Sequence, residues 1–122
     1  MKICITSQGK TLDSQVDPRF GRCSYLIVLD TDTMQFETIE NIFADASGGA
    51  GIQTGQLMVE KGVKAVLTGN VGPNAYQTLK AAGIIIYTGL SGTVSEAVGK
   101  LKNNELESKD KPSVNSHFGM NK

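Results

Sequence analysis

Tryptophan is absent from this chain, and histidine, cysteine and arginine are scarce: the 122 residues include one histidine, two cysteines and two arginines. Without tryptophan, the core must be mainly aliphatic. Two cysteines, Cys4 and Cys23, are too few for a disulfide framework, so reduced thiols are expected. The length suits one domain with one core.

The chain also lacks an excess of either charge and any long apolar run. Twelve basic and twelve acidic residues give a formal net charge of zero, which argues against a nucleic-acid-binding face. No apolar run approaches the roughly 20 residues of a membrane span, and the first residues are too short and too alternating for a signal peptide. We therefore expect a cytoplasmic protein without a membrane or nucleic-acid partner, and a monomer.

What is present is a regular succession of strand and helix patterns. Alternating or apolar runs predict strands at 2–7, 24–30, 35–41, 64–68 and 84–88. Helical spacing predicts helices at about 50–61, from Pro73 to Gly83, and after Thr93, where Glu96 completes a capping-box pattern. The order βββαβαβα predicts an α/β fold with a mixed five-stranded sheet flanked by helices. One domain would span 1–102, and the polar segment 103–122 reads as a flexible tail.

The periodicity also predicts which residues of these elements are buried. The first helix is expected to bury Ile52, Gly55 and Val59. The second is expected to bury Ala75, Leu79 and Ala82, and segment 84–88 is expected to be a third buried strand.

Both arginines lie in one short loop, residues 17–23, which reads DPRFGRC. Guanidinium groups suit carboxylates and phosphates, so Arg19 and Arg22 could grip one multivalent anion, with Phe20 anchoring the loop and Gly21 in its turn. In the alternative interpretation the loop is only a turn, and its arginines pair with Asp13 or Asp17.

Three glycine-rich corners precede the predicted helices. Helix N-termini at the carboxyl ends of parallel strands offer unpaired N–H groups, so together they could form a cup for an anion. Ordinary turn geometry explains the same glycines equally simply. The candidate binding residues at these corners are Gly48, Gly49, Gly51, Asn70, Gly72, Asn74 and Gly92.

Two residues are candidate metal ligands. Cys23 could be a thiolate whose pKa is lowered by Arg22 and a nearby helix end, or simply a small buried side chain. His117, in the tail, could complete a soft-metal site with Cys23 and Met120, or could be exposed and inert.

Four blocks carry a family resemblance: MKICITSQG, DPRFGR, GGAGIQTGQ and TGNVGPNAYQTLKAAGI, in this order. They resemble the nitrogenase iron–molybdenum cofactor biosynthesis family, which includes NifX, NifY, the carboxyl-terminal domain of NifB and small stand-alone relatives. The resemblance covers about residues 1–102. It implies a ribonuclease-H-like fold, and binding or carriage of an iron–sulfur cofactor precursor rather than catalysis.

The chain departs from this family at one position. Nitrogenase-associated members typically have D-x-His-Phe-Gly in the loop, with the histidine a suspected cluster contact, and Arg19 stands at that position here. A guanidinium does not normally ligate iron, so only Phe20 and Gly21 carry over. The chain resembles the stand-alone branch.

The sequence thus favours a non-catalytic carrier of an anionic iron–sulfur, possibly iron–molybdenum, cofactor or precursor, with a cluster donor or acceptor protein as a possible partner. The alternative is a binder of a phosphorylated small molecule or nucleotide at the glycine-rich corners. A ribonuclease-H-type nuclease is disfavoured, because its metal chemistry needs several converging carboxylates and the first strand has none.

Overall fold

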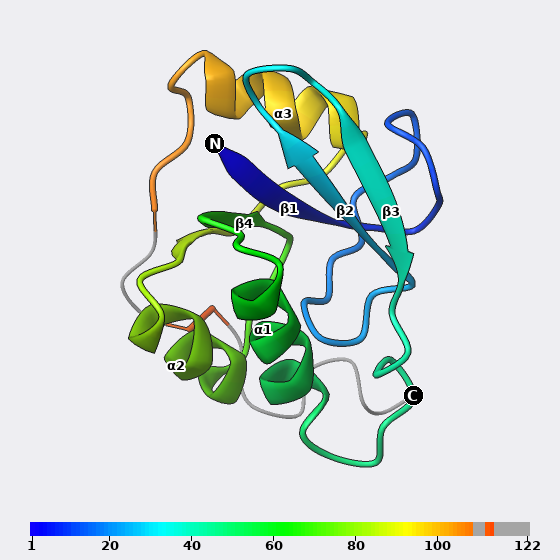
Figure 1. The fold of residues 1–122 in the computed structure, drawn as a ribbon, viewed down its shortest axis with the longest axis vertical. Helices are drawn as coiled ribbons and strands as arrows, with labels where there is room; N and C mark the ends of the chain where they lie inside the picture. The colour runs from blue at the N-terminus through cyan, green and yellow to red at the C-terminus, as the bar shows by residue number, and fades with distance from the viewer. Residues whose placement is uncertain (109–111, 114–122) are drawn as a thin grey trace.

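A computed structural model describes residues 1–108 and 112–113. The predicted element order βββαβαβα is confirmed (Figure 1). The strands are β1 (Lys2–Ser7), β2 (Tyr25–Asp30), β3 (Phe36–Glu40), β4 (Ala65–Leu67) and β5 (Ile85–Tyr87). The helices are α1 (Ala50–Glu60), α2 (Pro73–Ala81) and α3 (Val94–Lys102).

The five strands form one mixed sheet in the order β3-β2-β1-β4-β5. β1, β2 and β3 form an antiparallel meander, in which the long loop 8–24 joins β1 to β2 and the short turn 31–35 joins β2 to β3. β4 and β5 then add in parallel beside β1. This is the mixed sheet of a ribonuclease-H-like fold. β1 is the central strand, so its carboxyl end lies between the antiparallel and the parallel halves.

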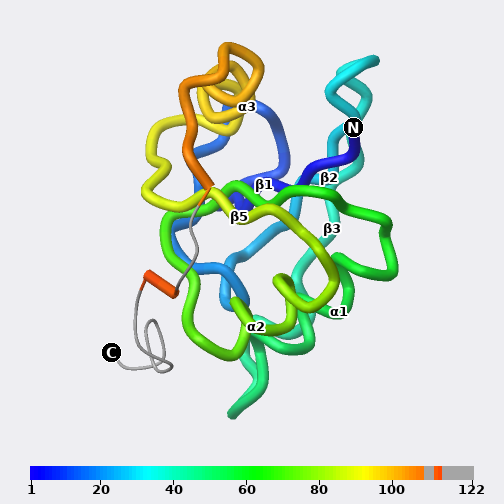
Figure 2. The backbone as a smooth tube through the Cα atoms, turned by 90° about the vertical axis from the view of Figure 1, so that its left-hand side faces the viewer, coloured from blue at the N-terminus to red at the C-terminus, as the bar shows by residue number. Residues whose placement is uncertain are grey.

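Helices cover both faces of the sheet. Alternation along β1 sends Cys4 to one face and Ile3 and Ile5 to the other, as the sequence predicts. α1 and α2 cover the Cys4 face and α3 covers the opposite face, so the sheet separates them (Figure 2). The core therefore consists of two mainly aliphatic layers, one on each face of the sheet.

The predicted buried face of α1 is only partly correct. Gly55 is buried, but Ile52 and Val59 are 37% and 48% exposed, and Thr54 and Met58 are buried instead. Relative to the predicted face, α1 is rotated about its axis, because it packs closely against α2 at Gly55. A Cβ on Gly55 would lie 2.9 Å from Thr78 Cγ2.

Two further burial predictions are wrong, one because the residue lies beyond the end of its helix and one because the strand lies at the edge of the sheet. Ala82 is exposed because α2 ends at Ala81, and Tyr76 is buried in its place. β5 is not a fully buried strand, because it is an edge of the sheet and Ile85 is 42% exposed.

Part of the segment after α3 lies against the domain body. Leu106 is partly buried against the α3 side of the core. The Ser113 N–H donates to the Val71 carbonyl at 2.9 Å, and the Ser113 hydroxyl accepts from the Val71 N–H at 2.8 Å. His117 and Met120 lie outside the described residues. In the described part of the chain, no helix has the length and apolarity needed to cross a membrane.

Candidate functional site

The arginine-containing loop, residues 17–23, lies at the carboxyl ends of β1 and β4. Two fully buried hydroxyls lie beneath it: Thr6 and Thr68 are hydrogen-bonded to each other at 2.7 Å, and Thr6 also donates to the Asp17 carbonyl at 2.7 Å. The Asp17 N–H in turn donates to the Thr6 carbonyl. The loop is thereby fixed to the two strands whose ends define the usual ligand edge of such a sheet.

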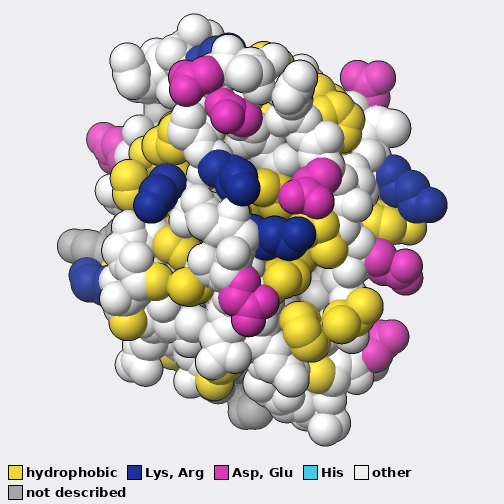
Figure 3. All heavy atoms as spheres, in the orientation of Figure 1, with side chains coloured by type: hydrophobic (Ala, Val, Ile, Leu, Met, Phe, Trp, Pro, Cys, Tyr) yellow, Lys and Arg dark blue, Asp and Glu magenta, His cyan; other side chains and the backbone are white. Residues whose placement is uncertain are grey.

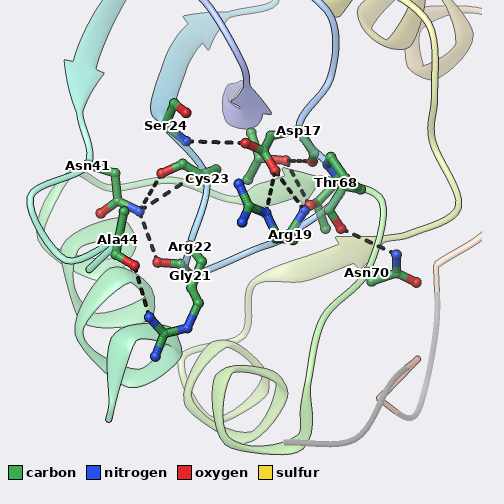
Figure 4. A network of polar contacts seen from close by, with 12 residues as sticks. Asp17, Arg19, Gly21, Arg22, Cys23, Ser24, Asn41, Ala44, Thr68 and Asn70 are labelled. Carbon is green, nitrogen blue, oxygen red and sulfur yellow. Dashed lines mark hydrogen bonds and ion pairs between the residues drawn. The ribbon is translucent and has the colours of Figure 1, made fainter. Parts of the chain in front are cut away.

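The Asp17 carboxylate organises the loop from within (Figure 4). Only 1% of its surface is exposed, and it accepts the Arg19 N–H at 3.0 Å and the Ser24 N–H at 3.2 Å. It also pairs with the Arg19 Nε at 3.3 Å. The predicted pairing of a loop arginine with Asp17 is confirmed. Because this pair uses only the Nε edge, the terminal nitrogens of Arg19 can still serve a ligand.

Phe20 and Gly21 anchor the loop to the helices. Phe20 is 7% exposed and packs in the core layer under α1 and α2, so it acts as the predicted anchor and does not line the site. Gly21 has φ +98°, and a Cβ there would lie 2.9 Å from the Cα of Gly51 in the first turn of α1. Glycine is required at position 21 by both conformation and space.

A second loop, residues 41–47, faces the first and is tied to it by Asn41. This buried amide donates to the Gly21 and Cys23 carbonyls at 2.9 and 3.0 Å. Its oxygen accepts the Phe43 N–H. Arg22 adds another tie, donating from Nη1 to the Ala44 carbonyl at 2.9 Å.

Between the two loops lies an open pocket of about 690 Å³, within the range typical of small-ligand sites. Arg19, Arg22 and Ser24 line one side, Tyr25, Glu40 and Asn41 the strand ends, and residues 44–47 the other side. The site therefore brings the chain's only two arginines to one polar pocket. On the face shown in Figure 3, basic side chains lie among acidic ones.

The cysteines do not supply this site with a thiolate. Cys23 and Cys4 are both fully buried. Burial, reinforced by the nearby Asp17 carboxylate, raises the pKa of Cys23 to about 12, although the Asn41 amide and Arg19 partly oppose the shift. Burial also raises the pKa of Cys4 well above its usual value. The prediction of a lowered Cys23 pKa is therefore wrong, because burial and the Asp17 carboxylate outweigh the opposing effect of Arg19. The alternative interpretation, a small buried side chain, is confirmed.

No metal centre emerges from the described residues: none of their His, Cys, Asp and Glu side chains form a group of three that could hold a metal ion. Protein-ligated iron–sulfur clusters normally take about four cysteine thiolates. The described part of the chain thus does not fit a cysteine-ligated cluster, whereas the two arginines that line the pocket fit an anion.

The predicted corners differ in what they offer. At the first, Gly49 is the N-cap of α1 in the left-handed conformation, with Gly48 beside it. Gly51 is placed by helix packing, since a Cβ there would lie 2.9 Å from the Ala75 Cβ of α2. The N-termini of α1 and α2 therefore lie together beside Gly21.

At the second corner, Asn70 is hydrogen-bonded to the arginine-containing loop. Its backbone and side-chain nitrogens both donate to the Pro18 carbonyl, and its own carbonyl accepts the Phe20 N–H at 3.0 Å. Gly72 is the N-cap of α2 and Asn74 lies exposed in its first turn. Within the described residues no side chain caps α1 or α2, and neither has an acidic residue in its first turn.

Gly92, at the third corner, does not belong to this site. It precedes α3 on the opposite face of the sheet, and the predicted capping box of Thr93 and Glu96 is confirmed. The Val94 and Ser95 N–H groups donate to the Ser14 and Leu12 carbonyls. The first-turn donors of α3 are thus already used, so the predicted three-corner cup is reduced to two corners.

Sequence reasoning missed the side of the pocket formed by Ser24, Tyr25, Glu40, Asn41 and residues 44–47. No motif marks these positions. Their only signal is that they flank the predicted hairpin strands, whose ends the sheet brings beside the arginine-containing loop.

Comparison with known proteins agrees with this fold. Residues 1–104 match the family model described as dinitrogenase iron-molybdenum cofactor, so the chain belongs to that family of small α/β proteins. The apo form of the orange protein of Desulfovibrio gigas is 38% identical, with a TM-score of 0.90 over 93% of this chain and 96% of that one.

Two further relatives are similar over most of their length. A NifB candidate from Thermotoga, of the DUF35 family, is 43% identical with a TM-score of 0.77, covering 88% of this chain and 91% of that one. An uncharacterized protein of Methanocaldococcus jannaschii is 28% identical over 98 residues, 78% of this chain and 83% of that one.

Proposed function

We propose that this protein is a non-catalytic carrier of an anionic iron–sulfur or iron–molybdenum cofactor, or of a precursor. The cargo would bind in the pocket between residues 19–24 and 40–47, with Arg19 and Arg22 as its main charged contacts. The observation that carries this proposal is the convergence of both arginines on one polar pocket while both thiols are buried. Membership of the cofactor family supports the class of cargo.

Binding through charge suits a carrier better than thiolate ligation. Charge-assisted hydrogen bonds to sulfide or carboxylate groups form without ligand exchange at the metal, so cargo can leave intact. The uncapped first turns of α1 and α2, adjacent to Gly21, add a partial positive charge near the pocket. The carrier would receive its cargo from a cluster donor protein or deliver it to an acceptor protein.

The test is anaerobic titration with a preassembled [4Fe–4S] cluster capped by hydroxyethanethiolate, whose hydroxyl end carries no charge, followed by visible absorption and iron analysis. Arg19→Gln and Arg22→Gln should each weaken binding by about tenfold, the loss of one charge-assisted contact. Cys23→Ala should bind like wild type, since that thiol is buried. Lys64→Gln, an exposed charge change outside the pocket, is the matched control.

Reconstitution with iron and sulfide provides an independent check. Stoichiometric colour that disappears in Cys23→Ala but persists in both arginine variants would overturn the proposed mode of binding, because it would make a cysteine the essential ligand.

The open helix ends favour a second candidate function, binding of a phosphorylated small molecule or nucleotide. Gly48, Gly49 and the first turn of α1 have the form of a phosphate site. Titration with ATP and inorganic phosphate separates the two. Micromolar binding of ATP without binding of the cluster would favour this second function.

A further inference from the structure

The pocket contains two carboxylates as well as two arginines. Glu40 ends β3, directly opposite Tyr25 in the sheet, and Asp45 lies in the turn that follows. Both side chains are exposed and line the same pocket as Arg19 and Arg22. Counted by charge, the pocket lining is balanced, with two positive and two negative groups.

These carboxylates do not neutralise the arginines by direct pairing. The ion pairs among the described residues place Arg19 on Asp17, and Arg22 donates to a backbone carbonyl instead. Neither Glu40 nor Asp45 takes part in an ion pair or a side-chain hydrogen bond with another described residue. Their charges therefore have no described partner and act on whatever occupies the pocket that they line.

We infer that Glu40 and Asp45 are specificity-determining residues that oppose retention of highly charged anions and so speed release of the cargo. The inference rests on the proposed function. It holds that the affinity for the cargo is set by the arginines, which attract the anion, and by the carboxylates, which repel it. The arginines hold the anion through directional hydrogen bonds, while the carboxylates cancel the long-range attraction that would otherwise grow with each added negative charge.

A charge-balanced pocket has a specific signature. Wild type should bind anions of the same shape but different charge with similar affinity, and should depend weakly on ionic strength. Removing both carboxylates leaves Arg22 without an opposing carboxylate and Arg19 with only the buried Asp17 as its partner. Affinity should then rise with the charge of the ligand and fall steeply with salt, because unbalanced charges interact over the screening length.

The experiment compares wild type with Glu40→Gln/Asp45→Asn, using the hydroxyethanethiolate-capped cluster in its dianionic and one-electron-reduced trianionic forms. These probes share one shape. In the double variant the dianion should bind about tenfold tighter than in wild type, with slower dissociation, and the trianion tighter still. Glu60→Gln/Glu107→Gln, which removes two exposed acidic charges outside the pocket, controls for net charge.

Tripolyphosphate is titrated against the same proteins, so that failure of the inference can be told from failure of the proposed function. If no variant binds the cluster but the double variant binds tripolyphosphate about tenfold tighter than wild type, the cofactor proposal fails and the role of the carboxylates stands. The inference is overturned if the double variant binds neither anion more tightly than wild type. It is equally overturned if the double variant loses affinity, which would make the carboxylates direct contacts.

Discussion

Gly21 and Gly51 pack backbone against backbone, joining the arginine-containing loop to the first turn of α1. The loop glycine has φ +98°, and a Cβ on it would lie 2.9 Å from the Cα of Gly51. Since backbone cannot rotate away as a side chain can, this contact fixes the position of the loop against the helix.

Gly21→Ala should therefore destabilise the protein by about 3 kcal/mol, combining left-handed strain with overlap. Gly48→Ala is the matched control, because nothing lies within 4 Å of its Cβ position, and it should be nearly neutral. Urea unfolding followed by circular dichroism measures both. Equal stability of the two variants would contradict the backbone contact.

The buried Asp17 carboxylate should be a main determinant of loop stability. Asp17→Ala leaves the Arg19 and Ser24 N–H groups without their acceptor and removes the partner of the Arg19 Nε. We expect a loss of about 3 kcal/mol in the free energy of unfolding. Asp13→Ala, at an exposed site in the preceding loop, should change it by less than about 0.5 kcal/mol. A similar loss in both variants would refute this role for Asp17.

Cys23 should make the fold sensitive to alkali. Its pKa is about 12 in the folded state and near 9 when unfolded, so above pH 9 the unfolded chain releases a proton that the folded chain keeps. The protonated thiol therefore contributes up to about 4 kcal/mol to the free energy of unfolding. This contribution is fully present below pH 9 and is lost as the pH rises toward 12.

The measurement is the urea midpoint at pH 8, 9, 10 and 11 for wild type and Cys23→Ala. The variant should lose less stability over this range, since it lacks the titrating group. Parallel curves would contradict the assignment. In the native protein at pH 8, a chromogenic thiol reagent should react with both cysteines only as fast as the chain unfolds.

Truncation of two neighbouring residues of α1 should destabilise the protein to different extents. Met58→Ala empties a fully buried site and should cost about 2–5 kcal/mol. Val59→Ala changes a half-exposed side chain and should cost less than about 1 kcal/mol. Thermal unfolding of the two variants decides which face of α1 is buried. A larger loss for Val59 would restore the face that periodicity predicts.

Local patterns in the sequence were enough to predict the order of the elements. The strands 2–7 and 24–30 and the helices that begin near Ala50, Pro73 and Thr93 are confirmed within one or two residues. Alternation, helical spacing, a proline at a first turn and a capping box act within a few residues, so they can be read without knowing the fold. The loop 17–23 was also identifiable, because both arginines lie in it.

The tertiary structure alone decided which residues meet. Pairing of β2 with β3 and β1 brings Asn41 and Asp45 to the loop that contains Arg22, although about 20 positions separate them in the chain. Helix rotation, set by Gly55 against α2, exposed Ile52 and Val59. Burial reversed the expected shift in the pKa of Cys23. Each of these depends on contacts between residues far apart in the chain, which no local pattern encodes. Of the pocket, the sequence by itself showed only that both arginines lie in one loop.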